Sequence, residues 1–169
     1  MKTLTAAQQQ AMAGDVQYEL DEFRSAIQAI PSLNHLRGSG RRSEWNRALE
    51  SALLHFRNLR DFFFKLGKPH RDDVFAEHYV KRWRPKPEAV FDTTKERIDK
   101  LLAHLSLGRL QLSREWPELD EMQEAIERGA SQFKQSLSPE QAKWFPRLDR
   151  PKIHLVIGAG FNSTASGPR

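Results

Sequence analysis

The sequence predicts an all-α protein, an antiparallel four-helix bundle with an extra short helix between its second and third long helices. Three observations support this prediction: apolar residues recur at helical spacing in four segments, the connections between these segments are short, and nothing before residue 150 reads as a strand. We expect residues 1–150 to form a single helical domain. Residues 151–169 have no periodicity and are expected to form an irregular, flexible C-terminal tail.

Composition narrows the function classes. A chain of 169 residues is long enough to bury a core in one domain. The absence of cysteine excludes disulfides, zinc-thiolate sites and thiol nucleophiles. The N-terminal segment lacks the apolar run of a signal peptide, and no stretch approaches the roughly 18 apolar residues of a membrane span, so we expect a cytoplasmic protein without a membrane partner. The net charge of +5 favours acidic partners such as nucleic acid.

The first helix is expected to begin after Thr5 and to end near residue 30. Thr5 and Gln8 have the spacing of a capping box, and Pro31 stands where helices commonly end. Its apolar stripe consists of Met12, Val16, Leu20, Phe23, Ile27 and Ile30. Residues 31–42 combine Pro, Gly, Ser and Arg and are expected to form a loop.

The second helix, over residues 45–66, is the longest apolar-rich run and is expected to organise the fold. Ser43 can cap its start, and Gly67 can close it. Its broad apolar face consists of Trp45, Ala48, Leu49, Ala52, Phe56, Leu59, Phe62, Phe63 and Leu66. Leu54 and Phe64 are apolar outside that face, which is typical of a helix that several neighbours or a partner subunit contact.

Three further helices are expected in the second half of the chain. Asp72 or Asp73 begins a short helix over residues 70–83, and a third long helix starts near Thr93. The third helix carries Ile98, Leu101, Leu102 and Leu105 on one face. The fourth helix has the stripe Leu119, Met122, Ile126, Ala130, Phe133 and Leu137, and a short turn opens at residues 138–141.

Two pairs of polar residues on these helices are candidates for chemistry. His55 and His104, on the second and third helices, could meet across the bundle, where burial would tune an imidazole pKa; the alternative is a pair of hydrogen-bonded boundary histidines. Arg57 and Asp61 lie four apart, which predicts an intrahelical ion pair. Their functional interpretation is an interface or active-site pair that faces the short helix or a second subunit.

A mixed cluster of histidines and carboxylates follows the second helix. Its members are His70, Asp72, Asp73, Glu77 and His78. These are metal-ligand side chains, but their spacing matches no metal motif and the ordinary role of Asp72 and Asp73 is to cap a helix, so no metal or cofactor is predicted. If the third helix continues past Gly108, Arg109 would point into its apolar stripe and would need a carboxylate partner, for which Asp61 and Asp73 are the candidates.

A basic stretch precedes the third helix. It consists of Lys81, Arg82, Trp83, Arg84, Pro85 and Lys86. Four cations around an exposed aromatic ring can grip phosphates and stack a base, which indicates a polyanionic partner. The alternative is a solvated connector in which Trp83 packs onto the bundle.

Three motifs in this part of the chain resemble a known family. Residues 55–59 (HFRNL), 72–76 (DDVFA) and 104–109 (HLSLGR) resemble small uncharacterised bacterial helical proteins, which are similar to HEPN (higher eukaryotes and prokaryotes nucleotide-binding) domains. The resemblance covers residues 43–110. It implies a helical bundle, often a homodimer, that binds RNA or a nucleotide. Many members are metal-independent ribonucleases of toxin or phage-defence systems.

The ribonuclease signature of that family pairs an Arg with a His a few residues later. Arg57 and Asn58 begin such a motif, but phenylalanines occupy the places where His is wanted. The pairs that satisfy the spacing are Arg97 with His104, Arg71 with His78, and Arg147 with His154, of which the last is interrupted by Pro151. In such a pair His would act as acid or base and Arg would stabilise the phosphorane. We expect binding of nucleic acid or a nucleotide, with a ribonuclease or a protein-interaction module as the alternatives.

Overall fold

The computed structural model describes residues 3–66, 69–86, 88–103, 107 and 115–148, and in these ranges every regular element is helical and no strand forms. The α-helices are α1 (Ala6–Leu33), α2 (Arg42–Phe64), α3 (Ala89–Ile98), α4 (Leu119–Ser136) and α5 (Pro139–Ala142). Shorter elements are the 3-10 turns η1 (Asn34–Leu36) and η2 (Ala76–His78) and the π turn η3 (Asp99–Ala103). The all-α prediction is confirmed, while the predicted tail over residues 151–169 lies outside the described residues. No described helix combines the length and apolar character that a membrane crossing requires.

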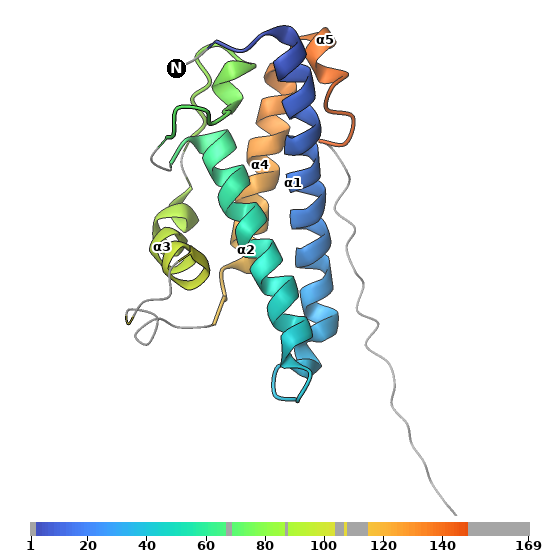
Figure 1. Ribbon diagram of the computed structural model, residues 1–169, viewed down its shortest axis with the longest axis vertical. Helices are drawn as coiled ribbons and strands as arrows, with labels where there is room; N and C mark the ends of the chain where they lie inside the picture. The colour runs from blue at the N-terminus through green and yellow to red at the C-terminus, as the bar shows by residue number, and fades with distance from the viewer. Residues whose placement is uncertain (1–2, 67–68, 87, 104–106, 108–114, 149–169) are drawn as a thin grey trace, which may run out of the picture.

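Three long helices form the body of the molecule. Figure 1 shows α1, α2 and α4 running alongside one another, with α3 on the outer side of α2. α2 and α4 both run opposite to α1. However, α3 has 10 residues, against 28 in α1 and 23 in α2. The predicted four-helix bundle is therefore matched only loosely, because a short helix takes the place of the third long one.

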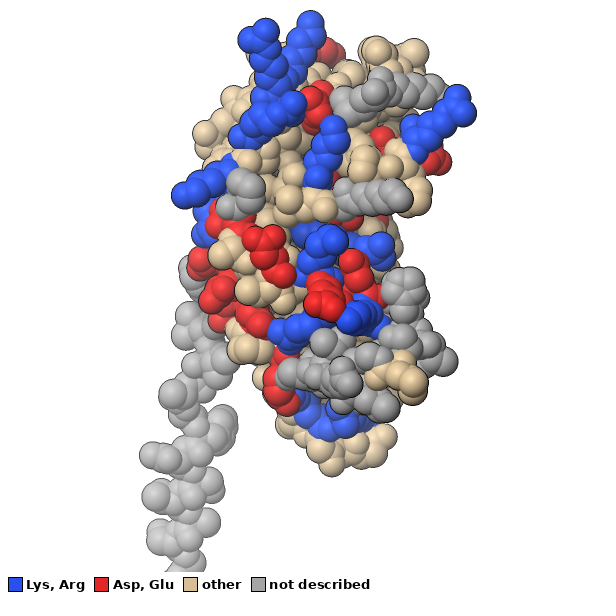
Figure 2. All heavy atoms as spheres, turned by 90° about the vertical axis from the view of Figure 1, so that its left-hand side faces the viewer, with Lys and Arg blue, Asp and Glu red and all other residues tan. Residues whose placement is uncertain are grey.

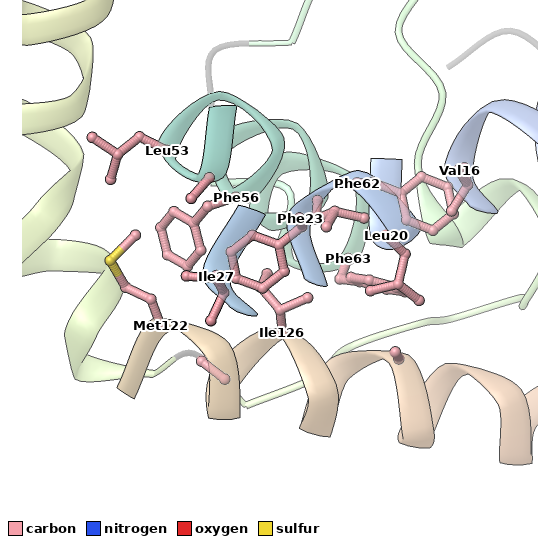
Figure 3. Close-up of a cluster of buried hydrophobic side chains, with 14 of the residues drawn as sticks. Val16, Leu20, Phe23, Ile27, Leu53, Phe56, Phe62, Phe63, Met122 and Ile126 are labelled. Atoms are coloured by element: carbon pink, nitrogen blue, oxygen red, sulfur yellow. The ribbon is translucent and has the colours of Figure 1, made fainter. Parts of the chain in front are cut away.

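The hydrophobic core lies between α1, α2 and α4. In Figure 3 apolar side chains from these three helices point toward one another. The labelled members are Val16, Leu20, Phe23, Ile27, Leu53, Phe56, Phe62, Phe63, Met122 and Ile126. Phe133 of α4 meets Phe62 and Phe63 edge to face, with ring centroids 5.5 and 5.7 Å apart. The apolar stripes predicted for the three long helices supply most of this core.

α2 also packs on a second side, as its extra apolar residues predict. The ring of Phe64 lies against Phe91 of α3, with centroids 4.5 Å apart. It also lies against Gly129 of α4, where a Cβ atom would come within 2.9 Å of the Phe64 ring. Gly129 therefore allows the close approach that joins α3 to the core, whereas Leu54 is exposed and makes no such contribution.

The ends of α1 and α5 follow their capping residues. The Thr5 hydroxyl accepts a hydrogen bond from the Gln8 N–H, and the Gln8 side chain accepts one from the Thr5 N–H, so the predicted capping box is confirmed. Ser138 and Gln141 form the same box at the start of α5. α1 continues past residue 30, with Pro31 inside its last turn.

The start of α2 differs from the prediction. The helix begins at Arg42, and the N-cap position is Arg41, whose side chain makes no capping bond, so the prediction of Ser43 as the cap is wrong. The Ser39 hydroxyl accepts from the Arg41 N–H, and this turn begins the helix earlier. α2 ends at Phe64, and the next residue, Lys65, has a left-handed conformation with φ 53°.

The predicted helix over residues 70–83 does not form, because only η2 within it is helical. The Asp73 carboxylate caps a turn instead of a helix, since it accepts a hydrogen bond of 2.6 Å from the His70 N–H. Phe75, Tyr79 and Trp83 are buried, so aromatic side chains spaced four apart anchor this connection to the core. Of the two interpretations of the basic stretch, the one in which Trp83 packs onto the bundle is confirmed and the one with an exposed ring is wrong, since Trp83 is buried and its indole N–H donates to the carbonyl of Phe63.

The third helix also differs from its prediction. α3 begins at Ala89, ahead of the predicted start near Thr93, and passes into the π turn η3 at Asp99. Among the apolar residues predicted for its stripe, Ile98 is fully buried, while Leu101 is partly buried within η3. The remaining part of the predicted helix lies outside the described residues.

Candidate functional site

A pocket of about 500 Å³ opens between α2, the connection over residues 70–75, and the junction of α3 with η3. It is lined by Arg57, Asn58, Arg60, Asp61, Phe62, His70, Asp73, Val74, Phe75, Lys95 and Asp99. Its volume lies within the range of about 300–1,000 Å³ that is typical of small-molecule sites. Because most of these side chains are charged or polar, the pocket suits a polar ligand.

Helical spacing explains why two helices supply charged side chains to this pocket. Arg57, Arg60 and Asp61 lie at positions i, i+3 and i+4 of α2 and therefore share one face. Lys95 and Asp99 are four apart across the junction of α3 and η3. The ring contact between α2 and α3 holds these two faces opposite each other.

Arg60 is a buried cation that is only partly satisfied. Its side chain is 1% exposed. Its Nε donates to Oδ1 of Asp61 at 3.0 Å, and its Nη2 lies 2.9 Å from the same oxygen in an ion pair. The Nη1 atom has no hydrogen-bond partner among the described residues. Removing a charge from water costs several kcal/mol unless good geometry and further hydrogen bonds compensate, so a second anion beside this guanidinium would be stabilised.

Sequence reasoning missed Arg60, although the sequence contains a signal for it. Arg60 follows Phe56 by four residues and precedes Phe63 by three, so it falls on the apolar face of α2. An arginine at such a position needs a buried partner. Arg109, for which the sequence likewise predicts a carboxylate partner, lies outside the described residues.

The predicted ion pair between Arg57 and Asp61 is wrong. Arg57 Nε lies 3.4 Å from Oδ1 of Asp99, and Asp61 is engaged by its neighbour Arg60. The second oxygen of Asp99 lies 4.0 Å from the Nζ of Lys95. These two pairs are long and partly exposed, and such pairs contribute about 0–1 kcal/mol. Oδ1 of Asp99 has no hydrogen-bond partner among the described residues, so neither cation is firmly bound to it and another anion can compete for Arg57 and Lys95.

The pocket joins three predicted site residues, Arg57, Asp61 and Asp73, which come from α2 and the connection that follows it. Asp73 holds the backbone of His70 at the edge of the pocket. Three carboxylates, of Asp61, Asp73 and Asp99, and three cations, of Arg57, Arg60 and Lys95, line the pocket together. Its formal charge is therefore balanced when His70 is neutral.

His55 lies outside this pocket and is hydrogen-bonded, as its structural interpretation predicts. It is 8% exposed, and its Nδ1 lies 2.7 Å from Oε2 of Glu19 on α1. The Asn58 side chain, which lines the pocket, donates to the same Glu19 oxygen at 3.0 Å. The predicted contact with His104 concerns a residue outside the described ranges and stays a prediction.

Arg97, a predicted catalytic residue, anchors the end of α3. Its Nη1 lies 2.7 Å from Oε1 of Glu118, its Nη2 donates to the Glu115 carbonyl, and its guanidinium lies 4.1 Å from the ring centre of Trp116. These contacts tie α3 to the segment that precedes α4. The position of Arg97 relative to His104 is untested.

The second predicted catalytic pair lies on the connection after α2. Arg71 is exposed, whereas His78 stacks on Phe75, with ring centroids 6.0 Å apart and planes inclined by 10°. Nδ1 of His78 accepts a hydrogen bond of 2.9 Å from the Phe75 N–H. This nitrogen is thereby committed to the backbone, and neither residue lines the pocket.

The basic stretch does not line the pocket. Lys81, Arg82, Arg84 and Lys86 are exposed, and Figure 2 shows basic side chains gathered at the upper end of the face that α3 belongs to. Below them acidic and basic side chains alternate. Arg84 and Lys65 contact Glu77 at 3.0 and 3.2 Å, and these two cations lower the pKa of the Glu77 carboxyl.

Within the described ranges no three histidine or carboxylate side chains are arranged to hold a metal ion. Comparison with known proteins adds no assignment: no family model, no curated protein and no solved structure matches this chain. The HEPN resemblance therefore stays a prediction.

Proposed function

We propose that the pocket binds a nucleotide, free or as part of a nucleic acid, through its phosphate group. One observation carries the proposal: the guanidinium of Arg60 is buried beneath a polar pocket and has an Nη1 atom without a partner among the described residues. Arg57 and Lys95 line the same pocket and hold Asp99 only weakly. Phosphate oxygens are strong acceptors, and arginine is the side chain best matched to their geometry.

The remaining lining supplies groups for the rest of a nucleotide. Asp61 and Asp73 each offer carboxylate oxygens that accept hydrogen bonds from ribose hydroxyls. Phe62, Val74 and Phe75 form an apolar part of the wall, against which a base can lie. The exposed basic stretch over residues 81–86 would contact the phosphates of a longer strand, in a cytoplasmic protein that meets RNA.

Two other proposals are favoured less. A ribonuclease would need free Arg and His side chains in one place, and both Arg97 and His78 are engaged in contacts that fix neighbouring backbone. A homodimer or protein-interaction module is supported by the exposure of Leu54 and Tyr18, which are 45% and 56% exposed. The exposure of Leu54 and Tyr18 does not identify a partner.

Calorimetric titration with adenosine monophosphate tests the nucleotide proposal. In Arg57→Gln we expect the affinity to fall at least about tenfold, since a charged hydrogen bond to phosphate contributes about 1.5–3 kcal/mol. The matched control is Arg47→Gln, an exposed arginine on the same helix that does not line the pocket, and its affinity should equal that of the parent protein. Equal loss in both variants, or no binding by the parent protein at millimolar nucleotide, would refute the proposal.

A further inference from the structure

We infer that this pocket accepts one phosphate group and discriminates against a polyphosphate chain. The inference rests on the proposed function and adds the class of nucleotide. It follows from the charge balance of the lining, in which each cation is accompanied by a carboxylate. Asp61 contacts Arg60 at 2.9 Å, and Asp99 contacts both Arg57 and Lys95 at 3.4 and 4.0 Å.

The charge of a single phosphate matches that of the cationic side chains that can turn away from Asp99 toward a ligand. Its charge of about −1.5 to −2 near neutral pH corresponds to the two cations that share Asp99, which are Arg57 and Lys95. Both side chains are partly exposed, at 39% and 48%, so they can turn toward a ligand without unfolding their helices. The positive charge of Arg60 beneath them adds to the attraction.

A second and third phosphate would meet carboxylates. Asp61, Asp73 and Asp99 come from three different elements, namely α2, the connection that follows it, and η3. Additional phosphates that stay within the pocket would therefore come near one of these carboxylates. Sites for polyphosphates commonly use glycine-rich loops whose backbone N–H groups face the ligand, and no glycine lines this pocket among the described residues.

The ligand chemistry is thus a phosphate monoester, which has two natural sources. One is a free nucleoside monophosphate, and the other is the terminal phosphate of an RNA or DNA strand. An internal phosphodiester carries a single charge and would be held less well. The exposed basic residues at 81–86 lie outside the pocket, so they would add affinity for a strand without changing the choice of phosphate.

Titration of the parent protein with AMP, ADP and ATP, each with and without Mg²⁺, tests the inference. We expect AMP to bind at least about tenfold more tightly than ATP, since each added charge near a carboxylate in a partly buried site is disfavoured by more than one factor of ten. A single-stranded hexanucleotide with a 5′-phosphate should likewise outcompete its 5′-hydroxyl form. Preference for AMP alone identifies the free nucleotide, preference for the phosphorylated strand identifies a strand end, and either result supports a single phosphate.

Asp99→Asn provides a second test, because it removes one carboxylate while keeping the shape of the side chain. We expect it to narrow the AMP preference over ATP severalfold, and an unchanged thermal midpoint would show that the fold is intact. ATP binding as tightly as AMP, with or without Mg²⁺, would overturn the single-phosphate inference while the proposed function stands. Absence of binding for every nucleotide and strand would overturn both.

Discussion

Arg24 and Arg60 are both buried, and they differ in how their N–H groups are satisfied. Arg24 on α1 donates from Nε and Nη2 to the two oxygens of Glu127, at 2.7 and 2.6 Å, and to the carbonyls of Arg147 and Leu148, both at 2.8 Å. Arg60 on α2 reaches one oxygen of Asp61 and leaves Nη1 without a partner among the described residues. A structural arginine and a candidate binding arginine can therefore be equally buried. What distinguishes them here is how many of their N–H groups have a hydrogen-bond partner.

The largest expected effect is on stability, at Arg24. Arg24→Met leaves Glu127, whose side chain is 18% exposed, as an uncompensated charge. It also removes the hydrogen bonds by which Arg24 holds two carbonyls of the segment after α5. We expect the free energy of unfolding to fall by about 3–5 kcal/mol, as is usual when one partner of a buried ion pair is removed. Urea denaturation measures this, and in the variant that remains folded the affinity for AMP should be unchanged.

At Arg60 we expect the opposite division between stability and binding. Arg60→Met removes an Nη1 group that had no partner among the described residues, together with two contacts to a single oxygen of Asp61. Asp61 is 29% exposed and can be hydrated once Arg60 is gone, so the loss of stability should be only about 1–2 kcal/mol. The affinity for AMP should fall by about tenfold or more. Denaturation and calorimetry on the two Met variants, run side by side, check the comparison. Similar destabilisation in both variants, with no change in nucleotide binding at Arg60, would mean that Arg60 is a second structural arginine.

The smallest expected effect concerns Glu77, a surface carboxylate with two cationic partners, Lys65 and Arg84. Their hydrogen bonds lower its pKa below the ordinary value of 4.5. Because the pKa of the folded state is the lower one, the stabilisation is present above pH 4.5 and is lost as the pH falls through the folded pKa. Glu77→Gln should lower the unfolding free energy at neutral pH by less than about 1 kcal/mol. The difference from the parent protein should shrink in denaturation experiments at decreasing acid pH; a constant difference would contradict the ion-pair explanation.

The long helices could be predicted because local rules agree with tertiary packing there. The capping box at Thr5 and the apolar stripes of α1, α2 and α4 are visible in the sequence and are present in the structure. The connection after α2 could not be predicted in the same way. Its aromatic residues have helical spacing, yet the backbone that carries them is mostly irregular. Their side chains are buried against the core, so tertiary contacts override the local helical pattern.

The pocket was predictable only in its separate parts. Arg57, Asp61 and Asp73 were singled out from the sequence, but as members of other interactions, because spacing along a helix does not reveal which element lies opposite. Asp99 and Lys95 joined the site through the packing of α3 on α2, which depends on the contact of Phe64 with Phe91. The periodicity of one segment does not predict such contacts between residues that are far apart in the sequence.

The two anchors of α3 have a consequence for the thermodynamics of ligand capture. Before its first turn, Glu88 is held by Arg128 at 3.0 and 3.2 Å, and at its end Arg97 contacts Glu118 at 2.7 Å. The wall of the pocket that α3 provides is therefore in place before a ligand arrives. Binding of a ligand therefore requires little further ordering of this wall. The entropic cost of binding is lower, so more of the contact energy appears as affinity.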